Sequence, residues 1–266
     1  MREGSLYKEL REWEIPVAPI SPINIERQYR KEIASLIQEY RSKSHMPELI
    51  DGVWQGFWKQ AVNINENQVP RCNRTTEEIA LLEKNGKMLL LLPDVIFKPK
   101  GLVKLANAFP WIRDSWITNL NYVQKIKHNS AVGGCIDVEA SISTPVDYTL
   151  LSKRELREKI EGQARNPQRI PTYITASVFR LLFTGSSFDQ TGTRSRLLGS
   201  WYEDKEKEVL SASFDSANNR IVFSHGNSDG SYPGLGGRSE GVSEKSNHIW
   251  RRVPYFVECS EGRKVA

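Results

Sequence analysis

The sequence predicts an α/β protein in which a mixed β-sheet is flanked by helices and continues into antiparallel hairpins. Three observations predict this class. Residues 1–85 are mostly helical in pattern, residues 86–185 alternate buried strands with a charged helix, and residues 186–266 are rich in hairpin signals. The chain has 266 residues, 39% of them apolar, and no linker divides it, so we expect a single domain over residues 1–266.

The overall charge and the absence of long apolar runs narrow the class of protein. The 37 Lys and Arg residues exceed the 32 Asp and Glu residues and give a net charge of +5, which favours anionic partners. The longest apolar run covers residues 88–92, far short of the roughly 20 residues of a membrane span. Met1 is followed by charged residues and not by a secretion signal. We therefore expect a cytoplasmic protein that has no membrane partner.

The cysteines argue against a covalent or metal-bound framework. Cys72, Cys135 and Cys259 are widely spaced and odd in number, and they form no CxxC pattern. We therefore expect neither a disulfide nor a structural zinc site.

The first elements are helical. The prolines within residues 16–22 predict an extended arm, and apolar residues at helical spacing predict a helix over residues 24–40. A tryptophan-rich helix is predicted over residues 48–62. The capping signal at residues 75–78 starts a further helix, which the Asn-Gly pair at residues 85–86 ends.

Strands then enter the pattern. The segment Lys87–Leu92 predicts a buried strand that Pro93 and Asp94 end. Residues 101–108 predict a short helix, and the alternating large side chains of residues 111–123 favour a strand or hairpin arm. Residues 132–142 predict the next strand.

The remaining chain is predicted to be rich in strands. Residues 152–163 begin with a serine N-cap and form a charged helix, and residues 173–184 favour a strong strand. Residues 208–214 and 220–224 flank a Ser-Ala-Asn-Asn turn and predict a hairpin, and residues 249–258 predict a final strand.

The stretch GGCIDVEAS, residues 133–141, places two carboxylates inside an otherwise apolar strand. In an extended chain residues two apart point to one face, so Asp137 and Glu139 should project side by side. Clustered carboxylates suit hard cations such as Mg²⁺, which take oxygen ligands. A third acid, Asp114 in WIRDSWIT, could meet this pair if its segment packs beside the strand. The structural alternative is a solvated strand face.

At these residues the chain resembles the PD-(D/E)xK nucleases, which include many type II restriction endonucleases. In that family an acid, a variable spacer and an acid-x-Lys strand build the site. The segment DVEAS from Asp137 to Ser141 is similar to the D-x-K-A-S strand of several members, and the order of the next helix and strand matches their core. The resemblance extends over residues 111–256. The usual lysine is Glu139 in this chain, as in a minority of restriction enzymes, which implies either that variant or a site that has lost cleavage.

The resemblance implies a restriction-endonuclease-like fold with residues 86–185 as its catalytic core. It also implies Mg²⁺-dependent hydrolysis of double-stranded DNA by a homodimer. In that mechanism Asp114 and Asp137 bind the metal, and Glu139 binds the metal or orients the attacking water.

Glycines and arginines in the C-terminal part predict contacts with DNA. The segment GLGGRSEG, residues 234–241, could approach a phosphate backbone closely, because glycines remove side-chain bulk. A second segment, residues 191–196, combines hydroxyl groups with arginines in a predicted loop. Arginine suits phosphates and guanine edges. The candidate contacts are Arg194, Arg196, Arg238, Arg251 and Arg252.

Two functions follow from the sequence. The first is the Mg²⁺-dependent endonuclease, which requires the three carboxylates to converge. The second is a non-catalytic nucleic-acid-binding or assembly subunit, such as part of a phage particle or a CRISPR-type complex. In the second function the acids are structural and the arginines still contact nucleic acid.

Overall fold

The computed structural model describes residues 35, 46–109, 111, 112, 114–190, 192–203, 208–227 and 234–241. The arm predicted at residues 16–22 and the strand predicted at residues 249–258 lie outside these residues, as does the helix predicted at residues 24–40 apart from Ser35. None of the helices within the described residues has the length and apolar character that crossing a bilayer requires.

The described chain is a mixed α/β structure built on two sheets in which antiparallel pairing predominates. The first sheet has the order β1-β3-β9-β4, and the second has the order β2-β5-β6-β7, with β8 pairing in parallel with β5. The strands of the first sheet are β1 (Lys87–Leu92), β3 (Gly134–Glu139), β9 (Ser239–Glu240) and β4 (Asn166–Pro167). Those of the second sheet are β2 (Ile126–His128), β5 (Arg194–Tyr202), β6 (Glu208–Asp215), β7 (Arg220–Asn227) and β8 (Leu235–Gly237).

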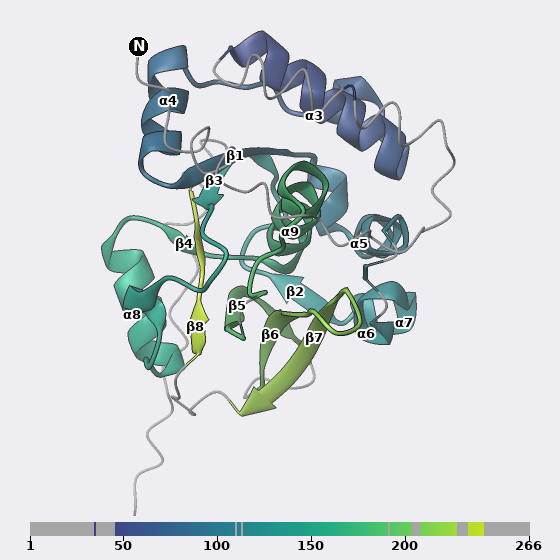
Figure 1. Cartoon of the computed structure of the whole chain (residues 1–266). Helices are drawn as coiled ribbons and strands as arrows, with labels where there is room; N and C mark the ends of the chain where they lie inside the picture. The colour runs from purple at the N-terminus through teal and green to yellow at the C-terminus, as the bar shows by residue number, and fades with distance from the viewer. Residues whose placement is uncertain are drawn as a thin grey trace, which may run out of the picture.

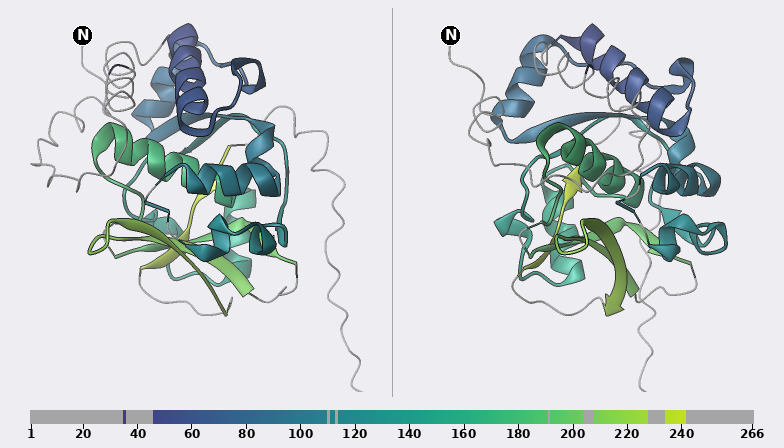
Figure 2. Two further views of the ribbon diagram at one scale, coloured as in Figure 1. Left: turned by 90° about the vertical axis from the view of Figure 1, so that its right-hand side faces the viewer. Right: turned by 45° about the vertical axis from the view of Figure 1, so that its right-hand side comes forward.

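Helices form layers around and between these sheets. The helices are α3 (Pro47–Val62), α4 (Thr76–Lys84), α5 (Pro99–Asn107), α6 (Ser115–Thr118), α7 (Leu120–Val123), α8 (Lys153–Gly162) and α9 (Ile170–Thr184), and the 3₁₀ turns are η1 (Glu66–Gln68), η2 (Asp94–Phe97) and η3 (Val146–Tyr148). In Figure 1, α3 and α4 lie above β1 and β3, and α9 lies between the two sheets. Figure 2 shows the same central position of α9 from two other directions. Helices α5, α6 and α7 stack at one side, and α8 lies at the other.

The strand predicted over residues 173–184 is wrong, because this segment belongs to helix α9. Every residue from Ile170 to Leu181 is buried. A helix that is apolar on all sides lacks the 3.6-residue pattern that distinguishes it from a buried strand. The signals that identify the helix are the proline in its first turn and Gly185 at its C-terminus, whose φ of 75° is a left-handed cap.

The strand predicted over residues 111–123 is also wrong, since the short helices α6 and α7 occupy most of it. Asp114 accepts a hydrogen bond from the backbone N–H of Trp116 at 2.9 Å. Asn119 accepts one from the N–H of Asn121 at 2.9 Å. Such local bonds from side chain to backbone favour helix starts over a sheet ladder. Alternating large side chains therefore did not indicate a strand here.

The other predicted elements within the described residues are confirmed, most clearly where capping signals marked them. Thr75 and Glu78 form the reciprocal bonds of a capping box at the start of α4, and Ser152 and Glu155 do the same at the start of α8. Strand β1 has the predicted bounds, and β6 and β7 form the predicted hairpin.

The core is centred on α9. Trp54 of α3 is fully buried and stacks on Phe179 of α9, with ring centroids 4.4 Å apart. Trp58 donates from its indole nitrogen to the carbonyl oxygen of Leu91 at 2.7 Å and so ties α3 to β1. On the other side of α9, Tyr173 packs its ring edge-on against Phe223 of β7. One apolar cluster therefore joins α3, both sheets and α9.

The buried carboxyl group of Glu83 on α4 makes stability depend on pH. Only 6% of this residue is exposed, and burial raises its pKa from 4.5 to about 7. The folded chain thus holds a proton that the unfolded chain has released. The contribution of the protonated Glu83 to the free energy of unfolding is complete below about pH 4.5 and is lost as the pH rises through 7. We expect Glu83→Gln to raise the free energy of unfolding by on the order of 2–3 kcal/mol near pH 8 and to change it little near pH 4.5.

Urea unfolding of the variant and of the original chain at the two pH values measures this difference. Glu161→Gln, which changes an exposed carboxyl on α8, serves as the control and should show no such dependence. An equal effect of Glu83→Gln at both pH values would contradict the raised pKa.

Candidate functional site

Strand β3 presents Asp137 and Glu139 side by side, as the sequence predicted, but basic side chains surround them. Arg165, which follows α8, places Nη1 2.6 Å from Oδ2 of Asp137. Lys87 of β1 stands opposite Glu139 in the strand register, and its Nζ lies 3.5 Å from the same Asp137 oxygen. Asp137 is therefore the shared partner of two cations.

Glu139 is held by the C-terminal strand β9. Its Oε2 accepts a hydrogen bond from the backbone N–H of Ser239 at 3.1 Å, and its Oε1 accepts from the Ser239 hydroxyl. Arg165 Nε donates to that hydroxyl at 2.5 Å and lies 3.7 Å from Glu139 Oε1. We call Lys87, Asp137, Glu139, Arg165 and Ser239 the acid-pair cluster.

The acid-pair cluster does not fit a magnesium ion. Its two carboxylates are balanced by two cationic side chains, so the negative charge that attracts Mg²⁺ is already neutralised. Asp137 Oδ1 packs so closely on Gly241 that a β-carbon there would collide with it. Within the described ranges, no three His, Cys, Asp or Glu side chains gather in a way that could hold a metal ion.

Asp114 does not join the pair. One of its carboxylate oxygens caps α6, and the other accepts a hydrogen bond from the backbone N–H of Phe223 in β7 at 3.0 Å. Both oxygens thus bind backbone groups, and β7 belongs to the second sheet, whereas Asp137 lies in the first. The predicted convergence of three carboxylates is not found.

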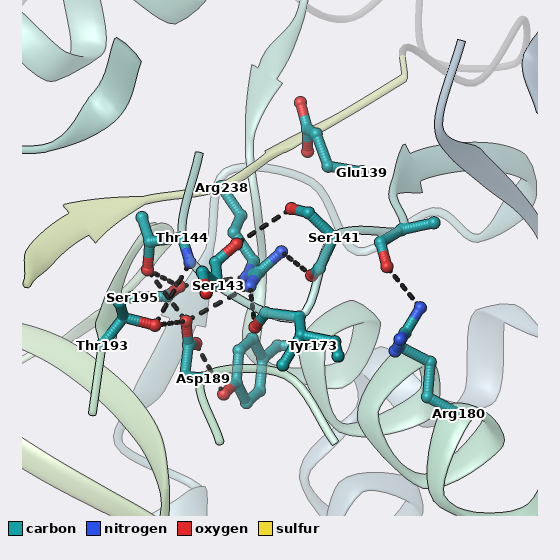
Figure 3. Close-up of polar contacts among 12 residues, drawn as sticks. Glu139, Ser141, Ser143, Thr144, Tyr173, Arg180, Asp189, Thr193, Ser195 and Arg238 are labelled. Carbon is teal, nitrogen blue, oxygen red and sulfur yellow. Dashed lines mark hydrogen bonds and ion pairs between the residues drawn. The ribbon is translucent and has the colours of Figure 1, made fainter. Parts of the chain in front are cut away.

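Arg238 is buried and cannot contact DNA in this conformation, contrary to the prediction. None of its surface is exposed, and its Nη2 lies 3.2 Å from Oδ1 of Asp189 (Figure 3). The guanidinium also donates to the carbonyl oxygens of Ser141 and Ile142, both at 3.0 Å, and stacks over the ring of Phe188 at 4.0 Å. Arg238 is a structural residue.

Hydroxyl groups complete the surroundings of Asp189. Thr144 and Thr193 donate to its Oδ1 at 2.8 and 2.9 Å, and Tyr173 donates to its Oδ2 at 2.9 Å. Both oxygens of this fully buried carboxylate therefore have partners, as a buried charge requires.

The other predicted DNA contacts divide into three groups. Arg196 is buried and donates to the carbonyl oxygen of Leu151, so the prediction fails for it. Residues 194–196 of its segment belong to strand β5 and not to a loop. Arg194 is exposed at the first position of β5. Arg251 and Arg252 lie outside the described residues.

The glycine-rich segment packs against the protein itself. Strands β8 and β9 and the residue between them are buried. A β-carbon at Gly236 would lie 2.5 Å from the Thr144 side chain, and one at Gly237 would lie 2.5 Å from that of Leu156. The glycines permit close approach, as predicted, but the surface approached is the protein core and not a nucleic acid.

Three successive residues of this segment bind three different partners. Arg238 pairs with Asp189, Ser239 with Glu139, and Glu240 with Arg169. We call residues 238–240 the RSE segment. It fixes the end of the described chain to β3, to the start of α9 and to the turn that precedes β5.

A different surface, made by α5, α6 and α7, combines positive charge with an exposed aromatic ring. Lys100, Lys104 and Asn107 are exposed along one side of α5 at spacings of four and three residues. Asn107 donates to the carbonyl oxygen of Thr118 at the end of α6, at 3.2 Å. Tyr122 of α7 is 40% exposed. Asn107 thus ties the helix that carries these lysines to the helix pair that carries the tyrosine, whereas Lys104 Nζ donates to the carbonyl oxygen of Asn63 at the end of α3, at 3.4 Å.

The ring of Tyr122 packs against a second aromatic side chain. Its centroid lies 4.8 Å from that of Trp116, which in turn packs edge-on against His225 at 4.8 Å. A third lysine, Lys98, is exposed directly before α5. We call Lys98, Lys100, Lys104 and Tyr122 the lysine–tyrosine face. Sequence reasoning missed this face because it treated α5 only as a short helix and residues 111–123 as a strand.

No protein-family model, no curated protein and no solved structure matches this chain.

Proposed function

We propose that this chain is a non-catalytic nucleic-acid-binding protein that contacts single strands through the lysine–tyrosine face. The observation that carries the proposal is that α5, which has exposed lysines, packs against the helix pair that carries the exposed ring of Tyr122. The net charge of +5 supports it. The pairing of Asp137 and Glu139 with Arg165 and Ser239 supports a structural role for the two acids.

Each part of the face has a role in this function. Lysine ammonium groups neutralise backbone phosphates and release their counterions, so binding weakens as salt rises. An aromatic ring offers a surface on which a base can stack, and a single strand has unpaired bases available for stacking. Trp116 behind Tyr122 keeps the ring in one orientation, which reduces the entropy that binding would cost.

Loss of the lysines is expected to weaken binding and to flatten its salt dependence. In the triple variant Lys98→Ala/Lys100→Ala/Lys104→Ala, the slope of log K against log salt should fall by about 2, at roughly 0.7 for each lost phosphate contact. Tyr122→Ala should weaken binding about tenfold while leaving the slope unchanged, since stacking is not ionic. Fluorescence anisotropy with a labelled single-stranded oligonucleotide, measured over a range of salt concentrations, gives both quantities.

The matched control removes three lysines from other elements. The variant Lys59→Ala/Lys84→Ala/Lys159→Ala changes the net charge equally, and all three side chains are exposed. The proposal fails if this control weakens binding as much as the first triple variant does. It also fails if the chain binds duplex more tightly than single strand, or binds neither at low salt.

A second candidate function is the restriction-type endonuclease, with a restriction-endonuclease-like fold and a homodimer on double-stranded DNA. Its cofactor Mg²⁺ would have to displace Lys87 and Arg165 from Asp137 and to bind without Asp114, since neither condition is met in this conformation. One observation favours it: Lys87 stands opposite Glu139 in the strand register. In this function the neighbouring strand would supply the lysine that the resembled family carries on the acid strand. Incubation with plasmid DNA and Mg²⁺ separates the two functions. Cleavage that is lost in a folded Lys87→Met variant would establish the endonuclease and refute the non-catalytic function.

A further inference from the structure

The glycine-rich segment, residues 234–241, fills a gap in the first sheet. Strand β9 lies between β3 and β4, and β4 pairs with no other strand in the described part of the chain. Without β9, the facing edges of β3 and β4 would carry unpaired backbone groups. A sheet with such edges accepts an extended strand from another chain in strand-addition complexes. The gap between β3 and β4 is thus a strand-binding groove that the glycine-rich segment occupies.

The partners of the glycine-rich segment all come from one earlier part of the chain. Every hydrogen bond and ion pair that it makes with the described residues goes to a residue between positions 137 and 196. The β6–β7 hairpin, which precedes the segment in the sequence, supplies none of these partners. Six residues, 228–233, connect that hairpin to the segment. The groove, and not the preceding hairpin, therefore holds the segment in place.

Opposite charges set the register of the segment in the groove. Arg238 pairs with Asp189, and Glu240 pairs with Arg169, and all four side chains are buried (Figure 3 shows the first pair). A shift by one residue would turn each side chain to the opposite face and leave buried charges without partners. The groove is therefore selective for this sequence, whichever copy of the chain supplies it.

We propose that two copies of this chain exchange the glycine-rich segment, so that the groove of each copy is filled by the segment of the other. This inference goes beyond nucleic-acid binding and does not depend on it. The exchanged dimer keeps every contact described above, because both copies have the same sequence. Its formation depends on protein concentration, whereas filling of the groove within one chain does not.

The first test refolds the original chain at two protein concentrations that differ by about a hundredfold. Size-exclusion chromatography with light scattering should find monomers at the lower concentration and dimers at the higher one. Unlabelled and isotopically labelled chains that are unfolded and refolded together should give mixed dimers in native mass spectrometry. A chain that stays monomeric at the higher concentration overturns the proposal.

Charge reversal assigns the dimer to this segment. Arg169→Glu brings two acids together, and Glu240→Arg brings two arginines together, so each variant alone should melt at a lower temperature than the original chain. In an exchanged dimer of the two variants, one groove has the original pair and the other has the reversed pair. Refolding the two variants together should therefore give a dimer that melts above either variant alone. The comparison holds even if neither variant folds by itself, because the mixture should then be the only folded sample.

The control is a pair of residues that cannot be exchanged with the segment. Arg154 and Glu158 are exposed and pair four positions apart on α8. Arg154→Glu and Glu158→Arg, refolded together, should give the same dimer fraction and melting temperature as each refolded alone. If the mixed Arg169 and Glu240 variants melt no higher than they do separately, the segment is not exchanged between copies.

Discussion

Replacement of Arg238 by alanine is expected to destabilise the fold by about 3–5 kcal/mol, because it leaves the Asp189 carboxylate buried without its cation. Both side chains are fully buried, so water cannot replace the lost partner. Urea unfolding measures the loss, and a fall in melting temperature of about 10 °C should accompany it. The result would establish that the central arginine of GLGGRSEG holds the core together.

The matched variants separate this role from nucleic-acid contact. Arg194→Ala removes an exposed arginine and should leave stability unchanged. The double variant Arg238→Ala/Asp189→Ala should lose less than the sum of the two single variants, since neither charge is then left unpaired. If Arg238→Ala kept full stability and lost only affinity for nucleic acid, the predicted DNA contact would be restored and the buried pair would be refuted.

Replacement of Trp54 by alanine should have an effect of similar size. The side chain is fully buried and stacks on Phe179, so its removal loses the transfer free energy of the indole and leaves a cavity between α3 and α9. We expect a loss of about 3–5 kcal/mol, measured by urea unfolding.

A second tryptophan gives the comparison. Trp201 on β5 is 39% exposed, and Trp201→Ala should cost far less than Trp54→Ala. Near-ultraviolet circular dichroism should lose the signal of a packed indole only in the Trp54 variant. Equal costs for the two variants would mean that the α3–α9 stack is not central to the core.

Elements whose ends carry local capping signals were predicted correctly from the sequence. The prediction was wrong for α9, where such signals were given less weight than the periodicity of apolar residues. The capping boxes at Thr75 and Ser152 involve side chains and backbone within three residues, so the sequence alone is enough to recognise them. Helix α9 had comparable signals in its first-turn proline and in Gly185, but its continuous burial removed the periodicity that was given more weight.

The candidate site was predictable only along a single strand. The alternation of β3 correctly places Asp137 and Glu139 on one face, because that rule is local. The partners of these two acids are Lys87 of β1, Arg165, which follows α8, and Ser239 of β9. Strands that are distant in sequence pair in this cluster, and their spacing in the sequence does not reveal that pairing. Lys87 and Arg165 were therefore missed, and Arg238 was assigned to solvent because a glycine-rich run resembles an exposed loop.

The contacts of the RSE segment span long stretches of sequence. Ser239 binds Glu139, which is 100 positions earlier, Glu240 binds Arg169, 71 positions earlier, and Arg238 binds Asp189, 49 positions earlier. Asp189, Glu139 and Arg169 thus have no partner from this segment until it has been synthesised. A ribosome adds about 5–20 residues per second, so several seconds separate Glu139 from Ser239 during translation. The final core is therefore closed late, and a nascent chain that stops short of Arg238 would expose two acids and a base that pair once this segment is in place.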